Sequence, residues 1–151
     1  MKTFLDLAQR VADLERRLHG LHRYGTVAEV DPKAGTVRLN LGAATGGGTY
    51  LSAPIPYAQT AGALKLHNPP SAGQQMLVTA PNGDPAQAIA QPMAFSAANA
   101  SPSEAADSHV LTFGGVNISL SGEALVITVG GSTVEIGSGS VSIQSPRIDL
   151  N

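Results

Sequence analysis

The feature that most constrains the fold of this chain is a short internal repeat in its last third. Five segments recur there along the chain, and each contains two apolar residues separated by one other residue. These pairs are Val116 and Ile118, Leu125 and Ile127, Val134 and Ile136, Val141 and Ile143, and Ile148 and Leu150. From one pair to the next the spacing is 9, 9, 7 and 7 residues, so the repeat shortens toward the C-terminus. Such a pattern predicts short strands with one apolar face, separated by turns rich in Gly and Ser.

The repeat leaves open what covers this apolar face. Units of 7 to 9 residues are too short to complete one coil of a single-chain β-helix, which has three sides. Three copies of the chain can each supply one wall of a tapering triangular prism, with the apolar faces on its axis. We therefore expect residues 109–151 to form a trimeric, intertwined β-helix or β-prism, since intertwining also removes free sheet edges. The alternative is an ordinary antiparallel meander packed on the preceding domain.

The N-terminal 22 residues have helical periodicity with a narrow apolar stripe. Its members recur every three or four residues: Phe4, Leu7, Val11, Leu14, Leu18 and Leu21. A strict stripe of this kind is typical of a coiled coil, whereas a helix on a globular core has a wider one. A trimer would cover the apolar stripe at the N-terminal end and the apolar repeat at the C-terminal end of the chain. We therefore expect residues 1–22 to form a trimeric coiled coil that stops at Gly20 or Gly25. The alternative is an amphipathic helix docked on its own domain.

The middle of the chain has the sequence pattern of a small β-barrel. Strands are expected at 26–30 and 36–41, around a turn that contains Pro32 and Gly35. Further strand-like segments lie near 51–55, 63–66, 75–79 and 87–91. Short antiparallel strands in a stretch of this size favour a five-stranded OB-fold over residues 23–95. Residues 96–108 are small and lack apolar periodicity, which predicts a linker before the C-terminal segment.

Composition excludes several classes of function. Charged residues make up 13% of the chain and the net charge is −2, which argues against a large electrostatic grip on nucleic acid. The absence of Cys excludes a thiol nucleophile and a disulfide framework. Glu29, Asp31, Asp84 and the four histidines form no triad, metal-ligand spacing or paired-carboxylate motif. We therefore expect no enzyme activity, no cofactor and no metal site.

Three stretches of the chain resemble the phage baseplate assembly protein V family, whose members are the central spikes of contractile phage tails. Residues 23–31 with 35–39 resemble the opening OB hairpin of that family, and this match is the most specific. Residues 69–78 with 81–84 resemble its next signature, and residues 109–115 resemble the start of its spike. The family is related to the spikes of type VI secretion systems and tailocins. The resemblance covers nearly the whole chain.

This resemblance implies a mechanical function. A homotrimer would be made in the host cytoplasm and carried in the virion at the tail baseplate. It would attach to the baseplate hub at the end of the tail tube, and it would puncture the host outer membrane when the sheath contracts. The implied partners are therefore the hub protein, the two other copies and, transiently, the outer membrane.

The chain departs from the family pattern at its tip. Many members end in a His-x-His loop whose histidines bind one iron in the trimer, whereas no His follows His109 here. We therefore expect no metal at the apex. Either the prism ends blunt or a separate small tip protein of the PAAR type covers it. The apolar Ile148 and Leu150 favour the tip protein, so we expect Ile148, Asp149, Leu150 and Asn151 to contact it. The family also commonly has a Trp before the Pro-Pro pair, and this chain has none.

Two rival functions remain at the level of the sequence. A trimeric adhesin or receptor-binding fibre could share the β-prism, although it would normally carry a bulky C-terminal head. An OB-fold that binds single-stranded nucleic acid would need basic residues interleaved with stacking aromatic residues. The barrel region is close to neutral, and its large rings are Tyr24, Tyr50, Tyr57 and Phe95.

Overall fold

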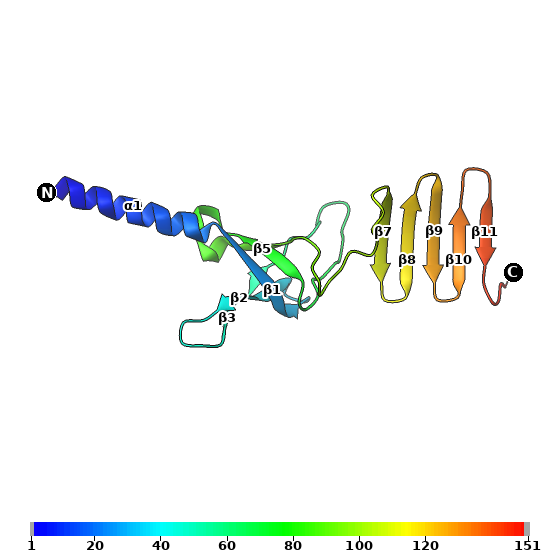
Figure 1. The fold of residues 1–151 in the computed structure, drawn as a ribbon, viewed down its shortest axis with the longest axis horizontal. Coiled ribbons are helices and arrows are strands. Elements are labelled where there is room, and N and C mark those ends of the chain that lie inside the picture. The colour runs from blue at the N-terminus through cyan, green and yellow to red at the C-terminus, as the bar shows by residue number, and fades with distance from the viewer. Residues whose placement is uncertain (1, 150–151) are drawn as a thin grey trace. The chain divides into compact units, whose positions relative to one another are not determined.

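The computed structural model describes residues 2–149 and divides into two compact units, Met1–Ala100 and Ser101–Asn151. The chain is mainly β, with a helix at its N-terminal end and one antiparallel sheet in each unit (Figure 1). This confirms the expected fold class at that level. The division between the units falls inside the linker predicted at 96–108. Among the described residues, no helix has the length and apolar character needed to cross a membrane.

Helix α1 (Lys2–Gly20) ends at the predicted glycine stop, two residues before the expected boundary at residue 22. Its apolar stripe is exposed, with side chains that range from 46% exposed at Val11 to 75% at Phe4. Leu21 lies beyond the helix, and its carbonyl accepts a hydrogen bond from the Ala80 N–H at 2.9 Å. Leu21 therefore lies outside the helical part of the predicted stripe, and its place in a trimer core stays a prediction.

The first sheet and its turns are built from short elements. These are β1 (His22–Asp31), β2 (Thr36–Ala43), β3 (Thr49–Leu51), β4 (Ile55–Pro56), β5 (Gln75–Thr79) and β6 (Ile89–Pro92), with the 3₁₀ turns η1 (Pro81–Gly83) and η2 (Pro85–Gln87). The strand expected near 63–66 is absent, and that segment has only the isolated bridge between Ala61 and Lys65. Its apolar residues Leu64 and Leu66 are exposed because no other segment of the sheet pairs with it.

Pairing in the first sheet runs through a cycle of five segments. Strand β1 pairs with both β2 and β5, β2 pairs with β4, and β5 pairs with β6. A parallel bridge between Tyr57 and Ala90 joins the end of β4 to β6, and the Ala58 N–H donates to the Ala90 carbonyl at 2.8 Å. One buried cluster fills the inside and draws residues from every member of the cycle: Val27, Val37, Leu39, Ile55, Tyr57, Met76, Val78, Ala80, Ala88 and Ala90.

The second unit is a meander of five strands. They are β7 (Ser108–Phe113), β8 (Val116–Ser121), β9 (Ala124–Val129), β10 (Ser132–Ile136) and β11 (Val141–Gln144). Each pairs with the next in the order β11-β10-β9-β8-β7 (Figure 1). An intertwined β-helix would alternate strands of different chains, whereas here consecutive strands of one chain are hydrogen-bonded to each other. Each chain therefore forms an uninterrupted sheet of its own.

The repeat predicted at Ile148 and Leu150 does not form a sixth strand within the described residues. Ile148 and Asp149 are outside any strand, and Leu150 lies outside the residues that the structure describes. Pro146 explains the end of the sheet, because it has no N–H to donate to a neighbouring strand. Beyond it, the Arg147 guanidinium pairs with the Asp149 carboxylate at 3.0 Å.

Two glycines lie at the contact between α1 and the β-domain, the name used here for β1 to β6 and the segments that connect them. A Cβ added at Gly20 would lie 3.1 Å from the Gly83 carbonyl oxygen, and a Cβ added at Gly83 would lie 2.5 Å from that of Arg17. Gly83 also has a φ of +70°, which side chains disfavour. The last turn of α1 can therefore approach η1 this closely only while Gly83 lacks a side chain, and a side chain at Gly20 would make a tight contact.

We expect Gly83→Ala to lower the free energy of unfolding of the Met1–Ala100 unit by about 2 kcal/mol, because the methyl group collides with backbone and the φ is unfavourable. Urea unfolding followed by circular dichroism measures the loss. Gly47→Ala is the matched control, because Gly47 also has a positive φ, +93°, yet has nothing within 4 Å. Equal losses in the two variants would contradict the close contact.

The core of the β-domain contains one unusual polar group. Tyr57 is 5% exposed, and its hydroxyl has no hydrogen-bond partner among the described residues. A buried hydroxyl without a partner loses its hydration without compensation. We therefore expect Tyr57→Phe to leave the unfolding free energy unchanged or to raise it by about 1 kcal/mol. Chemical denaturation beside the exposed-site control Tyr50→Phe measures this, and a loss above about 1 kcal/mol would show that the hydroxyl is bonded.

Candidate self-association surface

The register of the second sheet places its apolar residues on one face. Residues directly opposite each other in antiparallel strands point to the same side, so the pairing can be followed from strand to strand. Leu111 pairs with Ile118, Ile118 with Ile127, Ile127 with Val134, and Val134 with Ile143. These residues form a column across all five strands, which we call the central column.

Two further columns flank the central column on the same face. The His109 column contains His109, Leu120, Leu125, Ile136 and Val141. The Phe113 column contains Phe113, Val116, Val129 and Ser132 by backbone pairing, and Ser145 by its side chain. The Ser145 hydroxyl lies 2.8 Å from that of Ser132. Together the three columns make up what we call the apolar face.

Two-residue turns keep this register from β7 to β10. The turns begin at Gly114, Gly122 and Gly130, each of which has a φ between +54° and +56°. A positive φ at the first central residue is typical of the type II′ turn, whose twist matches that of a hairpin. Each turn therefore returns the next strand with its apolar residues on the same side as those of the strand before.

The opposite face, which we call the polar face, has a different chemistry. Its members are Ser108, Val110, Thr112, Asn117, Ser119, Ser121, Ala124, Val126, Thr128, Thr133, Glu135, Ser142 and Gln144. Hydroxyl and amide side chains dominate, and Glu135 is the one charged residue among these positions. This face is suited to water, whereas the apolar face is not.

The second unit has no core of its own. None of its described residues is buried, and the apolar face is exposed most strongly at Phe113, to 86%. A stable domain needs at least two packed layers, and here one layer stands alone. Full burial of a Val, Leu or Ile side chain stabilises a protein by about 1.5–3 kcal/mol relative to its exposure to water. Covering the apolar face would therefore stabilise this unit substantially.

The structure bears on each predicted axis residue. It brings Val116, Ile118, Leu125, Ile127, Val134, Ile136, Val141 and Ile143 to one face, which confirms the alternation predicted for them. It leaves Ile148 exposed and outside the sheet. Of the predicted tip residues, Ile148 and Asp149 are described, while Leu150 and Asn151 lie outside the described residues. That these residues form the axis of a trimer stays a prediction.

Several members of the apolar face were not among the predicted axis residues, although the alternation in the sequence already extends to Leu120 and Val129. His109, Leu111 and Phe113 form a strand of their own, and Leu120 and Val129 extend the apolar positions of β8 and β9. The signal was present as alternation, because each of these residues stands two positions from another member of the face. The predicted pairs already include members of all three columns, with Val116 in the Phe113 column, Leu125 in the His109 column and Ile127 in the central column.

The stripe on α1 is a second uncovered apolar surface. Phe4, Leu7, Val11, Leu14 and Leu18 lie on one side of the helix and are all largely exposed. Asp13 pairs with Arg16 and Arg17 away from this stripe. An isolated helix of this length is marginal in water, so packing of the stripe would contribute most of its stability.

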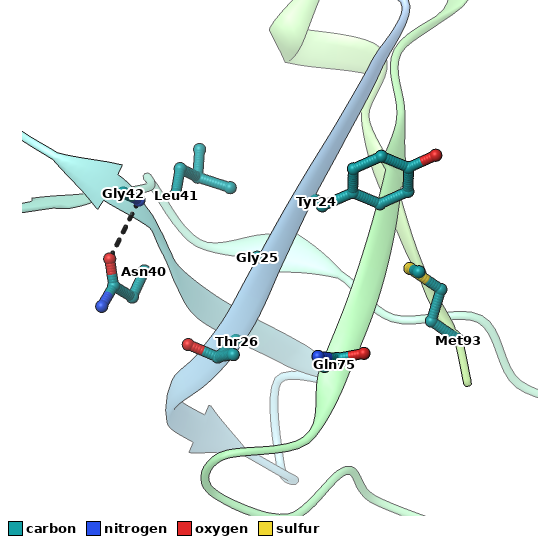
Figure 2. A pocket seen from close by; sticks show the side chains of 8 residues that line it. All are labelled: Tyr24, Gly25, Thr26, Asn40, Leu41, Gly42, Gln75 and Met93. Carbon is teal, nitrogen blue, oxygen red and sulfur yellow. Dashed lines mark hydrogen bonds between the residues drawn. The ribbon is translucent and has the colours of Figure 1, made fainter. Parts of the chain in front are cut away.

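A pocket of about 460 Å³ lies between residues of β1, β2 and β5. Figure 2 shows its lining, and Tyr24 and Met93 supply its largest apolar surfaces. The Asn40 side chain accepts from the Gly42 N–H at 3.0 Å. No acidic, basic or histidine side chain lines the pocket, so it offers no general acid or base of that kind.

The carboxylates considered as candidate catalytic groups have local structural contacts. Asp31 accepts from the N–H groups of Lys33 and Ala34 at 3.0 Å, and Asp84 accepts from that of Ala86 at 2.9 Å. Glu29 lies 3.4 Å from the Arg38 guanidinium. Among residues 2–149, no three His, Asp or Glu side chains come together as metal ligands could. These groups therefore stabilise turns and strands.

Comparison with known proteins adds no relative: no protein-family model and no curated protein sequence matches the chain.

If other copies cover the apolar face, Ile127→Asp should dissociate the assembly, because it places a charge in the centre of the face at a cost of at least about 3 kcal/mol per copy. Thr128→Asp, one residue along on the polar face, is the control and should associate as the unmodified chain does. Light scattering during gel filtration gives both masses. Association unaffected by Ile127→Asp would show that this face stays in water.

Proposed function

We propose that this chain is the central spike of a contractile tail baseplate, in which three copies pack their apolar faces around a common axis. The observation that carries the proposal is the register of the second sheet, which aligns the apolar side chains of five strands on one face and leaves that face without a cover. Each chain supplies one wall, as an unbroken meander, rather than interleaved strands.

The width of the wall supports three copies. A strand of five residues spans about 16 Å, at about 3.3 Å per residue. The centre of an equilateral triangle with that side lies about 5 Å from each wall, which is half of the roughly 10 Å that separates packed sheets. Four walls of the same width would leave the centre about 8 Å away, beyond the reach of aliphatic side chains that pack at sheet spacing.

The wall narrows toward its C-terminal end, as a spike should. Strands β7, β8 and β9 have 6 residues each, β10 has 5 and β11 has 4. The side chains of the Phe113 column shrink in the same direction, from Phe113 through Val116 and Val129 to Ser132. Narrower layers and smaller inward side chains together suit a tapering prism with a filled centre.

The remaining parts of the chain support attachment. The α1 stripe has the heptad spacing of a short coiled coil, so three helices can associate through it. The cycle of strand pairs, with its parallel bridge between Tyr57 and Ala90, supports the proposal of an OB-fold barrel. In the proposal, the helix and the barrel bind the baseplate hub.

The chemistry of the wall suits puncture of an outer membrane. Backbone hydrogen bonds link every strand to its neighbour along the stack, so a compressive load passes through the whole sheet. The polar face carries hydroxyl groups and one charge, which lowers the cost of desolvating the shaft as it crosses lipid. A small PAAR-like tip protein would cover β11, since an uncovered terminal strand is open to pairing with other chains.

Against the nucleic-acid alternative, the aromatic residues of the barrel are poorly placed. Tyr57 is buried in the core, whereas Tyr24 and Tyr50 are exposed. The pocket beside Tyr24 has no basic side chain in its lining. Binding of single strands depends on basic residues and successive aromatic platforms. The burial of Tyr57 and the lack of a basic side chain in the pocket beside Tyr24 therefore favour the spike over this alternative.

Electron microscopy of contractile particles from cells that produce the chain tests the proposed function. A gold-labelled antibody against the β-domain should mark the centre of the baseplate, at the end of the tube, because the spike sits there. Peripheral labelling on fibres, together with blocked adsorption by the purified protein, would contradict the proposal and favour an adhesin.

A further inference from the structure

We propose that the three walls meet through unlike edges, with the Phe113 column of one copy packed against the His109 column of the next. This inference rests on the proposed trimer and specifies which residues form its seams. The central columns of the three copies then face one another on the axis, and the two side columns form three corners.

The arrangement follows from the direction of the strands. Strands run across the wall, so the Phe113 column lies along one side of it and the His109 column lies along the other. A rotation about an axis parallel to the strand stack carries each wall to the next and brings unlike sides together, as in any closed ring. Strands of the same number meet in the same layer, so each corner pair comes from equivalent strands.

The sizes of the side chains agree with this pairing. In the β8 layer Val116 faces Leu120 of the next copy, and in the β9 layer Val129 faces Leu125. In the β10 layer Ser132 faces Ile136. From β8 onward the smaller residue therefore always lies in the Phe113 column and the larger one in the His109 column, so that each corner holds one small and one large side chain.

The polar members of the Phe113 column support burial of the corner. Ser132 and Ser145 lie on a face that is otherwise apolar, and their hydroxyl groups lie 2.8 Å apart. A buried hydroxyl needs a partner, and these two supply each other within one chain. One hydroxyl donates to the other, so the pair can face the aliphatic side chains of a neighbouring copy at a lower desolvation cost than two isolated hydroxyl groups.

Paired cysteines test the corner directly, because the natural chain contains no Cys. The variant Leu125→Cys with Val129→Cys places one thiol on each side of the wall in a single layer. The two positions are four residues apart on β9, about 13 Å along the strand, so they are too far apart to join within one chain. Mild oxidation should therefore link three chains into a covalent ring, seen as a trimer on a non-reducing denaturing gel.

The matched control is Ala124→Cys with Thr128→Cys, which has the same spacing on the same strand but on the polar face. It should remain monomeric on the gel. Leu125→Cys alone and Val129→Cys alone should also remain unlinked, because like residues lie in different corners.

The outcomes separate this inference from the proposed function. A native mass of three chains without covalent trimers, or with equal linking in the control, would overturn the corner arrangement and leave the trimer standing. Covalent dimers alone would indicate a two-sheet sandwich, and a monomeric native mass would remove the apolar interface; either result would overturn both.

Discussion

The structure depends on the register of the second sheet more than on any other feature. Because Gly114, Gly122 and Gly130 make two-residue turns, each hairpin returns its apolar residues to the same face. A slip by one residue would move those side chains to the polar face and mix the two surfaces. The register therefore determines both the exposed apolar layer and the near-uncharged outer surface, and the proposed trimer follows from the contrast between them.

The two units achieve stability by different means. The Met1–Ala100 unit closes its strand pairs around a core in which Leu39 and Met76 are fully buried. The Ser101–Asn151 unit has a single layer with no buried residue among those described, so its side chains depend on another surface for burial. In the proposed trimer the low proportion of aromatic and charged residues has a physical reason, since a thin axis would have room for Val, Ile and Leu, and a wall coated with hydroxyl groups would need few charges.

Much of this fold could be predicted from the alternation of apolar and polar residues, but the prediction failed at particular segments. The pairs in β8 to β11 predicted the strands and their shared face, because period-2 alternation follows directly from strand geometry. Alternation also predicted a strand at 63–66, which is absent because a strand needs a partner that local pattern does not reveal. Leu21 fitted the heptad spacing, yet α1 ends one residue earlier, at Gly20. The bridge between Tyr57 and Ala90 joins distant segments, and no local signal marks it.

The central claim is that three copies of the chain share one axis, and native mass spectrometry of the unmodified protein tests it most directly. The account predicts a species of about 46 kDa, three times the 15.4 kDa of one chain. It also predicts that this species persists on dilution, because the apolar faces are buried in the assembly. A mass of 15.4 kDa would contradict the account, and so would a stable dimer.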